Sequence, residues 1–204
     1  ANADDEIIIP EPYYANYISF SEAFDAVCVP ITSSFDNNFA LPPIEEFEKK
    51  ITPKTKAFLI CNPGNPTGYL YSKEEILQLA AIAKKYDIFL IFDEVYREFV
   101  YDGAQHFSIM QVPDIEQNAI MIDSVSKRFS MCGARIGWVV SKNKEVMKSI
   151  LKFAQARLSP PTYSQIGAEK AFDVPETYFE EVLKEYTQRR NVLIDALQKV
   201  EGVR

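Results

Sequence analysis

A strand–helix–strand pattern near the middle of the chain is the feature that most constrains its fold. The apolar run Ala57–Cys61 is followed by a Gly/Pro-rich loop, an amphipathic stretch from Lys73 to Tyr86, and a second apolar run, Ile88–Phe92. Ser72 and Glu75 form a capping-box start to the amphipathic stretch. Short apolar strands joined by such a helix indicate a βαβ unit with parallel strands buried on both faces. We therefore predict an α/β fold, a mostly parallel sheet flanked by helices.

Similar patterns extend this unit toward both ends of the chain. Short apolar runs predict further strands at 7–9, 27–31, 119–122 and 136–140, the last of them antiparallel. Helical spacing of apolar residues predicts a helix at 43–50 and a helical pattern from about Asn143 onward, through 146–157, 163–172 and 178–200. The aromatic stretch 12–24 is expected only to separate the first two strands.

Composition limits the kind of chemistry to expect. The 204 residues are 47% hydrophobic and carry a formal net charge of −7, with basic residues spread among acidic ones, so nothing predicts nucleic-acid binding. The apolar runs are far shorter than the roughly 20 residues needed to span a bilayer. Cys28, Cys61 and Cys132 are widely spaced and His106 is the single histidine, so we predict no metal site. We expect a soluble protein that acts on small molecules, with reduced and mostly buried thiols and His106 at a helix start or on the surface.

Polar residues follow each of the three central strands. Asn65 lies in the loop after the first, Asp93 and Tyr96 follow the second, and Lys127 follows the third. Ligands of parallel sheets bind beyond the carboxyl ends of the strands, so these side chains are expected around one cleft. An amine, a carboxylate, and an amide near a phenol suit a cofactor that carries an aldehyde, a ring nitrogen and a phenolate oxygen. Those groups indicate pyridoxal 5'-phosphate.

Three segments also carry a resemblance to a known family. Residues 62–68 (Asn-Pro-Gly-Asn-Pro-Thr-Gly), 93–96 (Asp-Glu-Val-Tyr) and 124–137 (Ser-Val-Ser-Lys-Arg-Phe-Ser-Met-Cys-Gly-Ala-Arg-Ile-Gly) resemble the signature segments of the class I/II aminotransferases, fold type I pyridoxal-phosphate enzymes. Residues 11–17 resemble bacterial aspartate aminotransferases. The resemblance implies that residues 1–175 are a cofactor-binding large domain without its N-terminal part. It also implies that residues 176–204 are a helix leading toward an absent C-terminal small domain.

The resemblance assigns a role to each residue around the expected cleft. Lys127 is similar to the lysine that forms the Schiff base and moves the proton at the substrate Cα, and Asp93 is similar to the carboxylate that pairs with the pyridinium nitrogen. Asn65 and Tyr96 resemble the pair that hydrogen-bonds the phenolate oxygen. We expect Lys127, Asp93 and Tyr96 to be catalytic.

The same resemblance assigns the remaining cofactor contacts. Ser124, Ser126 and Arg135 are similar to phosphate ligands, which would act through charge-assisted hydrogen bonds. Tyr14 resembles the aromatic residue that stacks on the pyridine ring, although the adjacent Tyr13 would also fit that role. Taken singly, either serine is also an ordinary helix cap.

The resemblance implies an enzyme that transfers an amino group from an amino acid, with aspartate as one candidate, to a 2-oxo acid. The complete protein is then expected to be a cytoplasmic homodimer, and this chain, a fragment, to be inactive or weakly active. One alternative is a lyase on the same machinery, which eliminates sulfur from amino acids or closes a cyclopropane ring. A second is the aminotransferase-like sensor domain of a transcription regulator, and a third is an inert folding unit with uncovered apolar surface.

Overall fold

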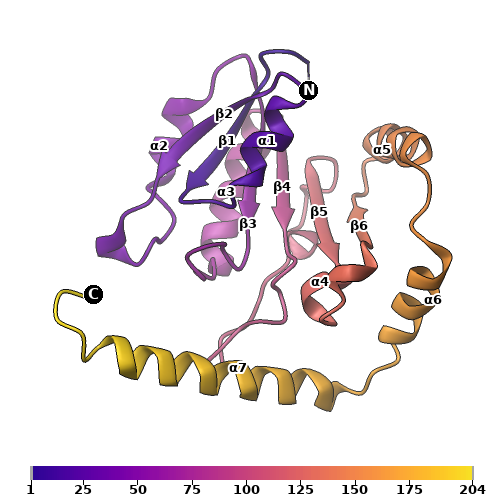
Figure 1. Cartoon of the computed structure of the whole chain (residues 1–204). Coiled ribbons are helices and arrows are strands. Elements are labelled where there is room, and N and C mark those ends of the chain that lie inside the picture. Colours follow the sequence, from indigo (N-terminus) through magenta and orange to yellow (C-terminus); the bar gives the residue numbers. More distant parts are fainter. Residues whose placement is uncertain (1, 204) are drawn as a thin grey trace.

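A six-stranded sheet forms the centre of the molecule, which the computed structural model describes from residue 2 to residue 203. The strand order is β2-β1-β3-β4-β5-β6, and all neighbours are parallel except the antiparallel pair β5 and β6 (Figure 1). The prediction of a mostly parallel sheet with an antiparallel last strand is confirmed. The strands are β1 (Glu6–Glu11), β2 (Val27–Thr32), β3 (Thr55–Cys61), β4 (Phe89–Asp93), β5 (Ala119–Ser124) and β6 (Gly137–Val140).

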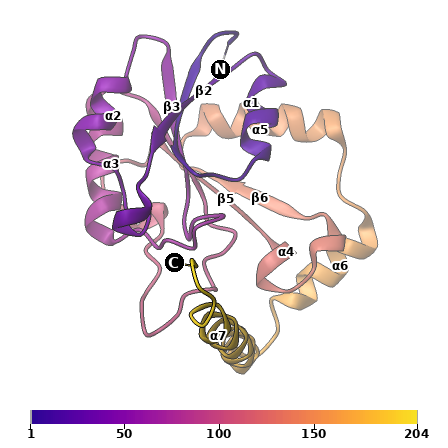
Figure 2. The same ribbon diagram turned by 60° about the vertical axis from the view of Figure 1, so that its left-hand side comes forward.

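Helices lie on both sides of this sheet. Figure 2 shows α2 and α3 on one side and α1 on the other. The chain then continues from the β6 edge through α5 and α6 into α7, which passes below the carboxyl ends of the central strands (Figure 1). The α-helices are α1 (Asn16–Glu22), α2 (Ile44–Lys50), α3 (Lys73–Lys85), α4 (Val125–Arg128), α5 (Lys144–Arg157), α6 (Thr162–Ala171) and α7 (Glu176–Leu197). Short 3-10 turns are η1 (Phe35–Asn37), η2 (Ile109–Gln111) and η3 (Cys132–Ala134).

Alternation of side chains along the strands divides the core between the two faces of the sheet. Ile8 and Phe58, which are paired in register, point into the larger apolar cluster that α2 and α3 cover. The next residues along the same strands, Ile9 and Leu59, point the other way and pack with Tyr17 of α1. Strands β1 and β3 are therefore buried on both faces, which explains why they read as continuous apolar runs.

The crossover helix α3 forms as its sequence predicts. The Ser72 hydroxyl accepts a hydrogen bond from the N–H of Glu75 at 3.1 Å, and the Glu75 carboxylate accepts one from the N–H of Ser72 at 2.7 Å. Ile76, Leu79 and Ala83 are buried against the sheet. The capping box and the apolar stripe thus fix both the start of the helix and the face that it buries.

The structure differs from the sequence predictions in two short helices, α1 and α4, and in several boundaries. Helix α1 lies in the stretch that was expected only to separate strands, because burial of Tyr17 rather than local helical spacing holds it. Helix α5 begins at Lys144, in agreement with the helical pattern expected from about Asn143, because the Asn143 side chain accepts hydrogen bonds from two N–H groups of the first turn. The division of the chain at residue 175 stays a prediction.

The structure corrects the expectation that the thiols are mostly buried and rules out the surface position for His106. Cys132 is exposed, whereas Cys28 and Cys61 are partly buried, and all three are free thiols. The His106 side chain is only 7% exposed and packs against Glu94. Among residues 2–203, no helix is both long and apolar enough to cross a membrane.

Candidate active site

A cleft of about 580 Å³ opens at the carboxyl ends of the central strands. It is bordered by the loop after β3, the segment after β4, the α4–η3 region and one residue of α7. Four of the residues expected in a cofactor site line it: Asn65, Tyr96, Ser126 and Lys127. The full lining is Pro63, Gly64, Asn65, Pro66, Gly68, Tyr96, Phe99, Tyr101, Ser126, Lys127, Ser130, Cys132 and Tyr186.

Backbone hydrogen bonds hold the loop that presents Asn65. Asn62 is fully buried: its side-chain oxygen accepts from the N–H of Tyr71 at 3.0 Å, and its own N–H donates to the carbonyl of Asp93 at 2.9 Å. Gly68 closes the loop by donating to the carbonyl of Gly64 at 2.8 Å, with a φ of +72° that favours glycine. The loop after β3 is therefore tied directly to the end of β4.

Asp93 ends β4 and receives two hydrogen bonds. The Tyr17 hydroxyl donates to Oδ2 at 2.7 Å, and the N–H of Val95 donates to Oδ1 at 3.2 Å. Burial raises the pKa of the Asp93 carboxyl, and the bonds from Tyr17 and Val95 oppose that rise. Burial, with the nearby Cys61 and Asp93, also raises the pKa of Tyr17, so its phenol stays protonated and acts as a donor.

Sequence reasoning missed the role of Tyr17. The residue lies 76 positions before Asp93, in a segment with tyrosines at 13, 14 and 17. The only signal in the sequence was that tyrosines, which carry a phenol hydroxyl, lie between the first two predicted strands. Nothing in the local pattern selects one tyrosine of the three as the partner of a carboxylate.

Lys127 projects from the single turn of α4 toward Tyr96. Its Nζ lies 5.7 Å from the centroid of the Tyr96 ring. The turn begins at Ser124, whose hydroxyl accepts a hydrogen bond from the N–H of Ser126 at 3.1 Å. Ser124 is thus a helix cap here, the ordinary alternative for this serine, while Ser126 borders the cleft.

Four of the expected site residues lie outside the lining of the cleft. Asp93 and Ser124 end the two strands beside it. Arg135 is exposed, has a left-handed backbone with φ of 57°, and donates to the carbonyl of Cys132 at 2.9 Å. Tyr14 is 39% exposed, and its phenol oxygen accepts from Asn16 at 2.8 Å. The cofactor contacts assigned to these residues stay predictions.

Comparison with known proteins identifies the architecture around this cleft. The family model of aminotransferase class I and II matches residues 1–204. The chain belongs to the class I and II aminotransferase family. The resemblance expected from the three motif segments is confirmed, and with it the fold type I large-domain architecture.

Individual members of the family are similar over nearly the whole chain. An aspartate aminotransferase from Bacillus sp. (strain YM-2) is 35% identical, and the match covers 98% of this chain and 51% of that protein. One from Geobacillus stearothermophilus is 34% identical, over 97% of this chain and 50% of the relative. The crystal structure of an aromatic aminotransferase from Pyrococcus horikoshii OT3 superposes with a TM-score of 0.90 at 30% identity, covering 98% of this chain and 53% of that one. The chain spans about half the length of these relatives.

Proposed function

We propose that the protein is a pyridoxal-phosphate-dependent aminotransferase that transfers an amino group from an amino acid to a 2-oxo acid. One observation carries the proposal: Lys127, Tyr96 and Asn65 border a single cleft, beside the strand end that carries Asp93. Membership in a family that generally depends on this cofactor supports it.

The residues present fit the cofactor chemically. The cleft volume of about 580 Å³ lies within the range of small-molecule and cofactor sites. A primary amine, a phenol and an amide border it, and a carboxylate held by two donors lies at the adjacent strand end. When bound, pyridoxal phosphate supplies an aldehyde carbon that amines attach to and a ring that takes up electrons.

Each residue then has a defined task. Lys127 would hold the aldehyde group and, as a general base, would move the proton at the substrate Cα. Asp93 would pair with the ring nitrogen, and Tyr17 would orient its carboxylate through the 2.7 Å hydrogen bond. Asn65 and Tyr96 would bind the phenolate oxygen.

The phosphate and ring contacts form the outer part of the proposed site. Ser126 at the cleft, with Ser124 and Arg135 nearby in the chain, would bind the phosphate, and Tyr14 would stack on the ring. The related Bacillus protein is named for aspartate and the Pyrococcus structure for aromatic substrates. Aspartate is the first donor to test, with 2-oxoglutarate as acceptor.

A homodimer in the cytoplasm is part of the proposal, and exposed apolar side chains such as Tyr163, which is 90% exposed, are consistent with a partner surface.

Borohydride trapping tests the proposal directly. The protein is incubated with pyridoxal phosphate and reduced, and the modified lysine is mapped by peptide mass spectrometry. We expect modification concentrated at Lys127, lost in Lys127→Ala and weakened in Asp93→Ala. Lys152→Ala, which removes an exposed lysine of α5, is the control and should change nothing. Modification scattered over surface lysines would contradict the proposal, and elimination products instead of amino transfer would favour the lyase alternative.

A further inference from the structure

A buried ion pair encloses the turn that carries Lys127. Arg128 donates from Nη2 to Oδ2 of Asp123 at 2.9 Å, and the other carboxylate oxygen of Asp123 accepts from the N–H of Ser124 at 2.7 Å. The pair joins Arg128, the last residue of α4, to Asp123 near the end of β5. Ser124, Ser126 and Lys127 therefore lie between the two bonded residues in the sequence. We propose that Arg128 is a positioning residue that fixes the direction of the Lys127 amine, an inference that rests on the proposed function.

The turn needs such support because α4 is very short. It consists of four residues, Val125–Arg128, closed at its start by the Ser124 hydroxyl. A single helical turn has too few internal hydrogen bonds to be stable by itself. Val125 is buried and anchors one side of it. The bond from Arg128 back to Asp123 closes the other side, which leaves Lys127 little freedom to tilt.

Arg128 also links this turn to the segment that carries Tyr96. Its Nε lies 3.2 Å from Oε1 of Glu98, two residues beyond Tyr96. Its guanidinium lies 5.8 Å from the ring centroids of Phe129 and Trp138. The side chain is therefore held between two carboxylates and two aromatic rings. Arg128 thus joins α4, which carries Lys127, to the segment after β4, which carries Tyr96.

Burial makes this pair sensitive to loss of one partner. The Asp123 side chain is 1% exposed and that of Arg128 is 12% exposed. Burial raises the pKa of the Asp123 carboxyl, while the Arg128 guanidinium, the N–H of Ser124 and the charge of Arg97 lower it. Removing Arg128 takes away the one cation bonded to this buried carboxylate and leaves only the charge of Arg97 nearby, which favours rearrangement of the turn around it. A displacement of about 1 Å in a catalytic group is enough to lower its reactivity by up to about a hundredfold.

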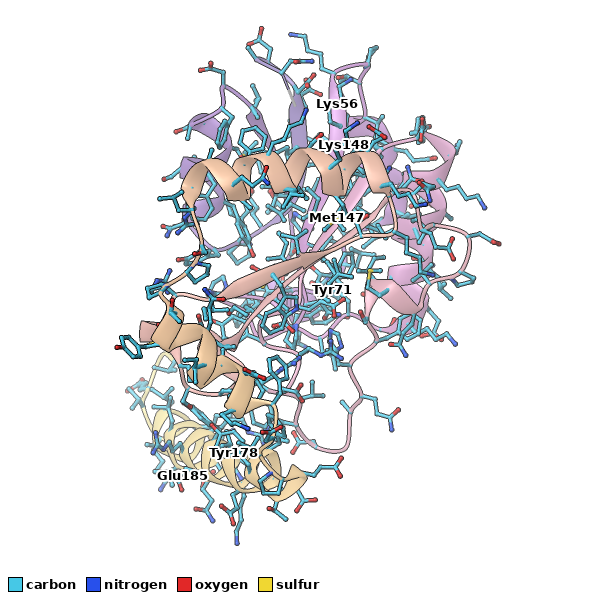
Figure 3. The ribbon with its side chains drawn as sticks, turned by 90° about the vertical axis from the view of Figure 1, so that its right-hand side faces the viewer. Lys56, Tyr71, Met147, Lys148, Tyr178 and Glu185 are labelled. Atoms are coloured by element: carbon cyan, nitrogen blue, oxygen red, sulfur yellow. The ribbon has the colours of Figure 1, made fainter. Side chains whose placement is uncertain are left out.

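Two measurements on the natural protein test the proposal. The first is amide hydrogen exchange of residues 124–130 without cofactor, and the second is the rate of borohydride-trapped modification at Lys127 with pyridoxal phosphate. The variants are Arg128→Met, which replaces the guanidinium with an uncharged, unbranched side chain, and Arg128→Lys, which keeps the positive charge. The control is Arg157→Met, which makes the same chemical change at an exposed end of α5. Figure 3 shows α5, marked by Met147 and Lys148, well separated from Tyr178 and Glu185 of α7.

We expect Arg128→Met to speed exchange in residues 124–130 and to slow trapping at Lys127, each by about tenfold. Arg128→Lys should recover part of both, and Arg157→Met should match the wild type. The proposal would be overturned if Arg128→Met had the same exchange rates and the same trapping rate at Lys127 as the wild type. It would also be overturned if exchange in Arg128→Met became faster while the trapping rate stayed unchanged. If the wild type itself is not trapped at Lys127, the proposed function is wrong and this inference falls with it, even where exchange responds to Arg128→Met.

Discussion

His106 is buried in a position that should make protein stability depend on pH. Its side chain is 7% exposed, and Nε2 lies 3.8 Å from Oε2 of Glu94, which is fully buried. Burial, with the nearby Arg97, lowers the pKa of His106 from 6.5 to about 4. The unfolded chain therefore binds a proton at a higher pH than the folded protein does. Stability from this residue should be complete above about pH 6.5 and should fall as the pH is lowered toward about 4.

The size of the effect follows from that difference in pKa. At 1.36 kcal/mol per unit, the full difference corresponds to about 3 kcal/mol, of which about 2 kcal/mol is lost between about pH 7.5 and about pH 5. Glu94 changes the free energy of unfolding in the opposite direction on acidification, because burial raises the pKa of its carboxyl while hydrogen bonds from Ile109 and Ser108 oppose that rise. The histidine contribution is therefore isolated by comparison with His106→Gln, which cannot titrate.

Urea unfolding of the wild type and of His106→Gln at each pH measures the difference. We expect the wild type to lose about 2 kcal/mol relative to the variant between about pH 7.5 and about pH 5. An NMR titration of His106, the single histidine of this chain, gives its pKa independently. A wild type that gains stability relative to the variant on acidification would refute the reasoning. It would mean that His106 is protonated in the folded protein and pairs with an ionised Glu94.

Substitutions at three further positions are tested by unfolding and by NMR titration. Tyr17→Phe removes the hydroxyl that donates to Asp93, so the pKa of Asp93 should rise further in an NMR titration. Urea unfolding of this variant should show a free energy of unfolding about 1.5–3 kcal/mol lower at neutral pH. Gly137→Ala places a Cβ 3.0 Å from the backbone oxygen of Asp123, so thermal unfolding should show a loss of about 1–3 kcal/mol; an unchanged midpoint would mean that β6 shifts freely. Ser124→Ala removes the cap of α4 and should cost about 1 kcal/mol, with Ser124→Thr close to wild type by the same measurement.

Much of the site could be predicted from short-range pattern. The apolar runs and the capping box of α3 predicted the βαβ unit, and the polar residues after each run predicted where the strand ends would meet. Asn65, Tyr96 and Lys127 border one cleft because parallel strands direct their carboxyl ends to the same edge. The expectation needed no knowledge of how distant segments pack.

The errors concern properties that depend on packing. The thiols were expected to be mostly buried and His106 to lie at a helix start or on the surface, whereas Cys132 is exposed and the His106 side chain is only 7% exposed. Helix α1 was missed because burial of Tyr17 holds it in place, not helical periodicity in its sequence. Exposure of a single residue is decided by which segments cover it, and a window of neighbouring residues does not contain that information.

By itself the sequence determined the strands and the longer helices, the capped crossover and the three polar turns, because periodicity, caps and turns act over a few residues. Only the tertiary structure decided that Tyr17 supports Asp93 and that Arg128 joins Asp123 to Glu98. These contacts join residues far apart in the chain, or select one partner among several similar ones. The register of the sheet and the packing of the segments after β4 and β5 bring those atoms close together. Neither can be predicted from a short stretch of sequence.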